Sequence, residues 1–219
     1  MDNPVQAFRS GRLEQVAKAL ERNGFAATVV PDENAARELV LGSIIPELVA
    51  QGAKVAAFGG SVTVVHSGVY EAVKAHPDLE VLDTYDRTDP AHTLELRRQA
   101  LLSDIFITGT NAVTEDGKLV NLDGTGNRVA ALAYGPRNVI VLVGGNKVVA
   151  DVDSGMRRIR EYAAPVNAIR LDRKTPCTKT LHCEDCSSPD RICNSWLVTA
   201  KSAPKKRIRV VLIDAEAGF

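Results

Sequence analysis

The chain contains apolar runs without polar interruption, and these constrain its fold more than any other feature. VAAF at 55–58 and VIVLV at 139–143 carry no polar residue at alternate positions. Strands of this kind need apolar cover on both faces, which is typical of a parallel sheet between layers of helices. The sequence therefore predicts a doubly wound α/β core with a mainly parallel sheet.

Helical and strand-like segments alternate along the rest of the chain. Asn3-Pro4 has the form of a helix start, and apolar spacing continues this helix to Asn23-Gly24. Further helices are expected at 32–51, 61–76, 92–102 and 152–163. Strands are expected at 25–30, 54–61 with its glycine turn, 79–84, 104–110, 138–145, 166–171 and 207–214.

A change of composition after Leu171 divides the chain into three parts. Residues 1–171 are interpreted as a ligand-binding core. Residues 172–206 are polar and rich in Cys, Pro and Ser, and we expect a bound metal to order them. Residues 207–219 are expected to return to the sheet as a final strand.

Charge and hydropathy exclude several classes of partner. The 27 basic and 27 acidic side chains cancel, so no overall field attracts nucleic acid. The basic run at 201–209 is interpreted as solvated charge beside an edge strand. No apolar run approaches the roughly 20 residues of a membrane span, and the polar N-terminus does not resemble a signal peptide. We therefore expect a cytoplasmic protein without a membrane partner.

Glycine turns follow three of the expected strands. In open α/β sheets, ligands bind beyond the carboxyl ends of the strands, where turns expose backbone N–H groups. One such turn can simply be a tight turn that needs positive φ, but three at equivalent strand ends favour a ligand cleft. The turn residues are Gly59, Gly60, Ser61, Gly109, Thr110, Asn111, Gly144, Gly145, Asn146 and Lys147.

The stretch at 109–132 concentrates polar chemistry. Asp116-Gly117 is typical of a hairpin turn, and the glycine loop at 123–128 is expected to open a helix at Val129. A nucleotide site is not supported, because neither G-x-G-x-x-G nor a Walker pattern is present. The stretch is interpreted as a ligand loop, with a solvated polar hairpin as the alternative. Its candidate residues are Glu115, Asp116, Asn121, Asp123, Gly124, Gly126, Asn127 and Arg128.

These motifs together resemble the lactate-utilisation, or LUD, domain family. The resemblance rests on GGS at 59–61, TGTNAVTEDGKLVNLDGTGNRVAAL at 108–132, YGPRNVIVLVGGNKVV at 134–149 and TPCTKTLHCEDCSSPDRICN at 175–194. It covers essentially the whole chain. It implies a fold similar to the sugar-phosphate isomerase and CoA-transferase superfamily, and an association with iron–sulfur systems of lactate oxidation. It does not supply a reaction for this domain alone.

All four cysteines of the chain lie within a short segment. A C-x2-C step lets two thiolates reach one ion, and the outer two cysteines can complete four sulfur ligands. The spacing fits neither a ferredoxin nor a zinc ribbon, so zinc, an iron–sulfur cluster, a redox-sensitive disulfide and plain thiols all stay open. The resemblance favours a [4Fe-4S] cluster, with zinc as the alternative. The predicted ligands are Cys177, Cys183, Cys186 and Cys193.

Two hypotheses of function follow from these features. The first is an enzyme or enzyme subunit acting on a small carboxylate or phosphorylated metabolite of lactate oxidation. In it Glu115 is the general base or nucleophile, Asp123 assists it, and Asn127 and Arg128 help to hold the anion. The second is a non-catalytic electron-transfer or assembly subunit that works with iron–sulfur redox partners. The sequence leaves a homodimer open.

Overall fold

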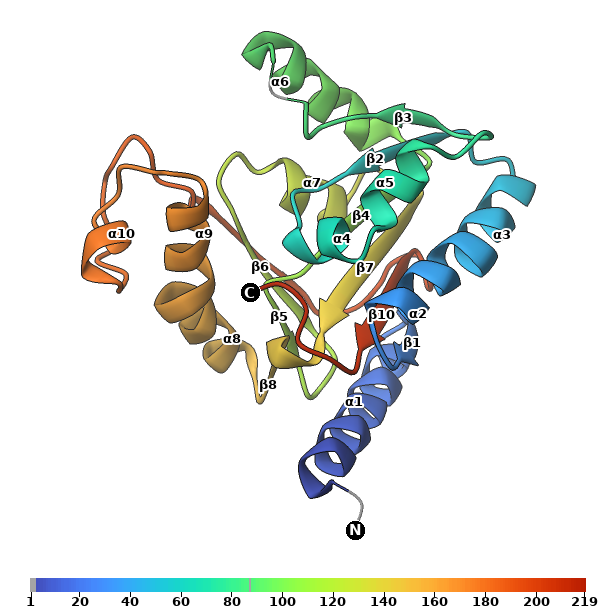
Figure 1. The fold of residues 1–219 in the computed structure, drawn as a ribbon, viewed down its shortest axis with the longest axis horizontal. Coiled ribbons are helices and arrows are strands. Elements are labelled where there is room, and N and C mark those ends of the chain that lie inside the picture. The colour runs from blue at the N-terminus through green and yellow to red at the C-terminus, as the bar shows by residue number, and fades with distance from the viewer. Residues whose placement is uncertain (1–2, 87) are drawn as a thin grey trace.

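The structure is a computed structural model that describes residues 3–86 and 88–219. Its largest element is a six-stranded sheet of order β1-β10-β7-β4-β2-β3, in which every pair of neighbours is parallel. The predicted α/β class with a mainly parallel sheet is therefore confirmed (Figure 1). The strands are β1 (Ala26–Val30), β2 (Val55–Phe58), β3 (Glu80–Leu82), β4 (Ile105–Gly109), β7 (Asn138–Gly144) and β10 (Ile208–Ile213).

A smaller, four-stranded sheet of order β8-β5-β6-β9 lies against one face of the first. The predicted turn at Asp116-Gly117 joins its antiparallel strands β5 and β6. Gly117 has φ +81°, and a Cβ there would lie 2.5 Å from the backbone of Ala19, so the turn abuts the N-terminal helix. The strands are β5 (Ala112–Thr114), β6 (Leu119–Asp123), β8 (Val148–Val149) and β9 (Ser195–Thr199).

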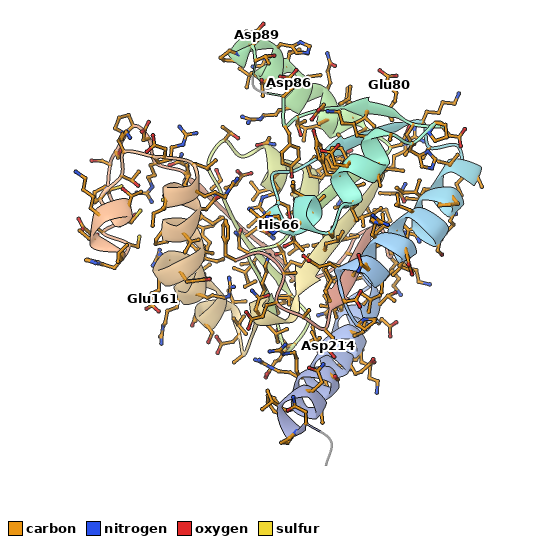
Figure 2. All side chains as sticks on the ribbon, viewed as in Figure 1. His66, Glu80, Asp86, Asp89, Glu161 and Asp214 are labelled. Atoms are coloured by element: carbon orange, nitrogen blue, oxygen red, sulfur yellow. The ribbon has the colours of Figure 1, made fainter. Side chains whose placement is uncertain are left out.

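Helices cover both sides of this assembly, as Figure 1 shows. The helices α2, α3, α4 and α5 cover one face of the large sheet, and α1 and α7 cover the other. A long helix formed by α8 and α9 covers the outer face of the small sheet, and Glu161 lies on its exposed side (Figure 2). The helices are α1 (Pro4–Arg22), α2 (Glu33–Leu39), α3 (Ile45–Ala50), α4 (Val62–His66), α5 (Val69–Lys74), α6 (Pro90–Gln99), α7 (Asn127–Ala133), α8 (Val152–Arg158), α9 (Ala164–Arg170) and α10 (Cys177–Thr180).

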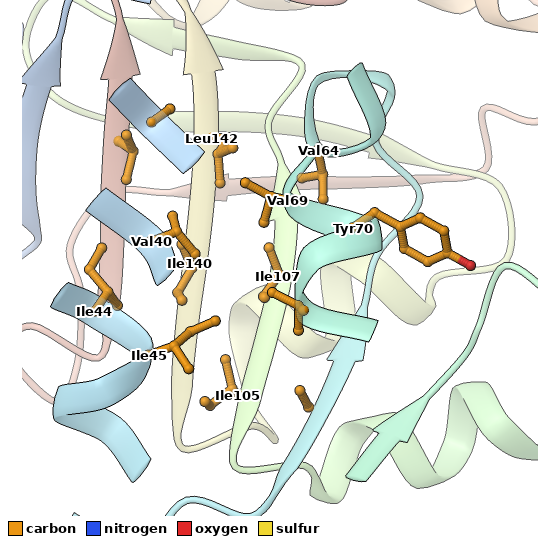
Figure 3. Close-up of a cluster of buried hydrophobic side chains, with 14 of the residues drawn as sticks. Val40, Ile44, Ile45, Val64, Val69, Tyr70, Ile105, Ile107, Ile140 and Leu142 are labelled. Carbon is orange, nitrogen blue, oxygen red and sulfur yellow. The ribbon is translucent and has the colours of Figure 1, made fainter. Parts of the chain in front are cut away.

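The apolar run in β7 explains why both faces of the sheet need cover. Ile140 and Leu142 pack under α2–α5 in the cluster of Figure 3. Val139, Val141 and Val143 pack on the other side with α1 and the small sheet. All of these side chains are completely buried, and each Å² of apolar area removed from water stabilises the fold by roughly 25 cal/mol. The middle of the large sheet is therefore the centre of the core.

Two local predictions were wrong. Residues 166–171 are not a strand, because α9 continues the preceding helix through a π-helical turn at Ile159–Ala163. A short apolar run is ambiguous in sequence, and Pro165 lies just after this π-helical turn, which interrupts the regular α-helical bonding before it. The strand β9 was missed inside 172–206, and it pairs with β6. The basic run at 201–209 lies between β9, an edge strand of the small sheet, and β10, which is central in the large sheet.

The described helices include none that is long and apolar enough to span a membrane.

Candidate functional site

The three predicted glycine turns lie at one edge of the large sheet. They follow β2, β4 and β7, which are adjacent and parallel, so their carboxyl ends meet. The connection after β2 leads to β3 on one side, whereas the chain after β4 proceeds to β7 on the other. This reversal marks the boundary between β2 and β4 as a topological switch point, which is where open α/β sheets bind ligands.

Two of the turns touch each other closely enough to require glycine. A Cβ at Gly109 would lie 2.6 Å from Oγ of Ser61, and a Cβ at Gly59 would lie 2.6 Å from Oγ1 of Thr108. The side chain of Tyr85 holds the first turn, because its hydroxyl accepts from the backbone N–H of Ser61 at 2.8 Å and lies 3.1 Å from the carbonyl of Gly59. Tyr85 therefore already occupies one N–H that an anion could have used.

Lys147 is a buried cation at this edge. Lys147 lies in the turn after β7, and only 4% of the residue is exposed. Its Nζ donates to Oγ1 of Thr63 at 2.9 Å. Burial, with the charges of Arg158 and Arg128 nearby, lowers the pKa of Lys147 to about 7. The amine is therefore partly neutral near physiological pH.

Arg128 is buried among protein oxygens and organises the ligand loop. Nη1 donates to Oδ1 of Asn121 at 2.5 Å and to the carbonyl of Gly109 at 3.3 Å. Nη2 donates to Oδ1 of Asn111 at 2.8 Å and to the carbonyl of Leu122 at 2.7 Å. These four bonds engage the terminal nitrogens, so the expected two-point grip of Arg128 on an anion is not available in this arrangement. Burial lowers the pKa of Arg128.

Donors outnumber acceptors around this edge. Arg158 on α8 donates to the carbonyl of Asn111 at 2.9 Å, and burial lowers its pKa. Nδ2 of Asn121 is buried with no hydrogen-bond partner. Within residues 3–86 and 88–219, no carboxylate forms an ion pair with Lys147, Arg128 or Arg158. The arrangement therefore favours a ligand that supplies acceptors and negative charge.

The proposed acid–base residues do not meet. Glu115 lies at the turn end of β5, where Nε of Arg12 donates to its Oε1 at 2.8 Å and half of its side chain is exposed. Asp123 lies at the far end of β6, and its Oδ2 accepts from the backbone N–H groups of Arg128 and Val129. Asn127 is bonded to the hydroxyl of Thr125. The hairpin thus separates Glu115 from Asp123 by the length of its strands.

The C-terminal segment at 214–219 lies over Lys147. Oδ2 of Asp214 accepts from Gln6 and Ser10 of α1, which holds the start of the segment beside that helix (Figure 2). Further along, Thr63 donates to the carbonyl of Ala217, and Nδ2 of Asn146 donates to the carbonyl of Gly218. A Cβ at Gly218 would lie 3.2 Å from Nζ of Lys147. The segment therefore closes the site from outside.

The remaining turn glycines serve close packing. A Cβ at Gly144 would collide with the backbone of Ala217, and Gly124 lies against the backbone of Ile192. Gly126 has φ +88° immediately before α7. Sequence reasoning missed Thr63, Tyr85 and Arg158, because their contribution depends on tertiary contacts between distant segments. The lone basic pair Arg157-Arg158 on a helix carries no motif that singles it out.

The four cysteines gather around a pocket beside α9 and β9. All four are free and half-buried, and they line one pocket whose cavity volume is about 30 Å³. Burial raises the pKa of the Cys193 thiol. Arg191 holds the surrounding loop, because it donates to the carbonyls of Cys193 and Cys186 and to the carboxylate of Asp185. Among the described residues, however, no three Cys, His, Asp or Glu side chains are close enough together to hold an ion.

A comparison with protein families shows the family to which the chain belongs. Residues 13–213, most of the chain, match the LUD domain. The chain belongs to the LUD domain family. This confirms the resemblance that the sequence motifs indicate. No curated protein matches this LUD domain chain.

Solved structures bear on the fold of the LUD domain. A DUF162 family protein from Deinococcus radiodurans is 18% identical with a TM-score of 0.50, over 94% of this chain and 98% of that one. The delta subunit of eIF2B from Chaetomium thermophilum is 17% identical with a TM-score of 0.33, over 79% of this chain. The LUD domain chain spans about half the length of that subunit, 56% of it. At 18% identity, the likeness to the DUF162 family protein concerns the fold alone.

Proposed function

We propose that this LUD domain chain binds a small carboxylate or phosphorylated metabolite at the carboxyl edge of β2, β4 and β7. The observation that carries the proposal is the surplus of buried donors around Lys147. Lys147 and Arg158 lack an acidic partner among the described residues, and Asn121 keeps an unused N–H group. A bound anion would satisfy these groups and offset the cost of burying their charge.

The proposal changes the roles expected from the sequence. Lys147 and Arg158 replace Arg128 as the groups that contact the anion, and Arg128 shapes the loop that carries Asn111 and Asn121. Glu115 stands outside this site, because its carboxylate pairs with Arg12 on α1. The glycine turns at 59–61, 109–111 and 144–147 form the floor of the site.

Calorimetric titration with lactate and with inorganic phosphate tests the anion site. We expect Arg158→Ala to weaken binding by about 1.5–3 kcal/mol, the range for a hydrogen bond to a charged group. Arg157→Ala is the matched control, because this neighbour on α8 is exposed and should leave the affinity unchanged. Equal affinity in the Arg158 and Arg157 variants would remove Arg158 from the site, and absence of binding by both anions would overturn the proposal.

A role in lactate oxidation is the wider part of the proposal. Membership of the LUD domain family supports a lactate-utilisation-related role. We propose that the chain acts there as an enzyme or enzyme subunit on a small carboxylate or phosphorylated metabolite. The alternative is a non-catalytic electron-transfer or assembly subunit beside iron–sulfur redox partners, and the four-cysteine pocket is the observation that favours it.

We further propose that the four-cysteine pocket binds a metal, with a [4Fe-4S] cluster favoured and zinc as the alternative. Four thiols on one pocket form a donor set that suits either group. Cys177, Cys183, Cys186 and Cys193 would hold it, and an iron–sulfur cluster would supply one-electron transfer when bound.

A visible spectrum with metal analysis of the anaerobically purified chain tests this second site. Broad sulfur-to-iron absorption with stoichiometric iron supports the cluster, and a colourless protein with one zinc supports the alternative. The control variant is His182→Ala, because this exposed histidine bonds to the carbonyl of Thr180 and should not affect metal content. If the anaerobically purified protein binds neither iron nor zinc, even after reconstitution with each, the site is contradicted.

A further inference from the structure

Lys147 combines features that an anion-binding lysine does not need. A lysine that only neutralises an anion works best fully charged and near solvent. Lys147 is instead buried, and its Nζ donates to a single hydroxyl, that of Thr63. We propose that Lys147 binds a 2-oxo acid covalently, as an imine between Nζ and the ketone carbon. This inference rests on the proposed anion site and names its ligand class.

The nucleophile must carry a free electron pair. An ordinary surface lysine is almost entirely protonated at neutral pH and cannot attack a carbonyl. Burial next to the guanidinium groups of Arg158 and Arg128 disfavours the ammonium form, and the pKa of Lys147 falls to about 7. Desolvation and neighbouring cations are the means by which lysines become nucleophiles in proteins.

The same surroundings select a carbonyl compound that also carries a carboxylate. Arg158 lies near Lys147, keeps its positive charge, and has no acidic partner among the described residues. Nδ2 of Asn121 adds a buried N–H group without an acceptor. A 2-oxo acid places its carboxylate on the carbon next to the ketone. One end of such a ligand can therefore meet the amine while the other meets the guanidinium.

The reaction needs no oxidant or metal. The electron pair of Nζ forms a bond to the ketone carbon, the carbonyl π pair moves to oxygen, and one amine proton passes from the nitrogen to that oxygen. The carbinolamine then loses its hydroxyl, which leaves as water with the second amine proton, and a C=N double bond remains. The ketone oxygen leaves in the water molecule, so the sum is amine plus 2-oxo acid giving imine plus water.

Entry to Lys147 requires the segment at 217–219 to move. It is held there by the hydroxyl of Thr63 and by both groups of the Asn146 amide. Ala217 is buried in the core, and Phe219 lies against Arg170. These contacts involve only a few residues, so local opening of the segment exposes much less surface than unfolding of the sheet and costs less free energy. When the segment is in place, it excludes water and protects an imine from hydrolysis.

Reductive trapping tests the inference on the full chain. The protein is incubated with pyruvate and sodium cyanoborohydride, digested, and mapped by mass spectrometry. We expect Lys147 to gain the mass of pyruvate less one oxygen atom, at far higher occupancy than the exposed Lys18 of α1. Methyl pyruvate, which lacks the carboxylate charge, should label Lys147 about tenfold less, and so should pyruvate with Arg158→Ala.

Parallel calorimetry with lactate and phosphate, which cannot form an imine, separates this inference from the anion site. If these anions bind but pyruvate labels Lys147 no more than Lys18, the imine is overturned and the anion site stands. If neither anion binds and Lys147 is not labelled, both are overturned. Because the adduct is mapped in the unchanged protein, the result does not depend on whether a Lys147 variant folds.

Discussion

Lys147 links the chemistry of the site to the stability of the fold. Its pKa is about 7 in the folded chain, against 10.5 for an ordinary lysine. Between these values the unfolded chain binds a proton that the folded chain lacks, so the free energy of unfolding rises with pH. The stability that comes from the neutral amine is fully present above about pH 10.5. It decreases as the pH falls and is lost once the pH has fallen through about 7.

We predict that Lys147→Met removes this dependence. The free energy of unfolding of the variant should be higher than that of the wild type near pH 6–7, and the difference should shrink as the pH rises toward 10. Urea titrations of both proteins across this range measure it, with Lys18→Met as the exposed control. A difference that does not vary with pH would contradict the buried amine.

Arg128 is expected to act on stability rather than directly on the ligand. Arg128→Ala removes four hydrogen bonds, to Asn111, Asn121, Gly109 and Leu122, so the free energy of unfolding should fall by more than about 2 kcal/mol. Arg128→Lys should recover little of this, because an ammonium cannot span four oxygens. Thermal melts of the two variants that match the wild type would show that these bonds do not form.

At the scale of elements, the β5–β6 hairpin is fixed by its turn against α1. We predict that Gly117→Ala destabilises the chain by more than about 1 kcal/mol, because φ +81° is strained for alanine and the new Cβ would meet the backbone of Ala19. Gly11→Ala on α1 is the control, since nothing lies within 4 Å of that Cβ and alanine favours helix. Equal denaturant midpoints for both variants would contradict the docking.

Elements with a strong local pattern were predictable from the sequence, and those defined by distant partners were not. The turn at Asp116-Gly117 and the uninterrupted run in β7 carry their own signals. β9 becomes a strand because β6 offers it an edge, with Leu197 facing the sheets and Trp196 facing α8 and α9. The three glycine turns were found in sequence, whereas Thr63 and Arg158 join them only through α4 and α8.

At the scale of the whole molecule, the two sites share a wall. Asn194 donates its backbone N–H to the carbonyl of Asp123 and its side-chain amide to that of Gly124, so the cysteine segment is bonded to the ligand loop. Leu122 both lines the cysteine pocket and accepts from Arg128. Ordering of the cysteine segment should therefore also order the loop at 123–126, which precedes α7.

We predict that replacing Cys183 and Cys186 together by Ser removes bound metal and loosens residues 172–194, while the large sheet stays folded. The loop at 181–187 is exposed and has few apolar contacts, so its order would come mainly from the metal. Hydrogen exchange should rise in that segment and in 122–126, and stay unchanged in β7 and β10. Full metal content in the double variant would contradict the four-thiol site.

A crystal structure of the chain with lactate or phosphate bound tests the anion site. We predict that the anion lies at the carboxyl ends of β2, β4 and β7, within hydrogen-bond distance of about 3 Å from Nζ of Lys147 and from the guanidinium of Arg158. Residues 217–219 should be displaced or rearranged around it. An anion bound elsewhere at saturating concentration, with Lys147 still covered and bonded only to Thr63, would contradict this site.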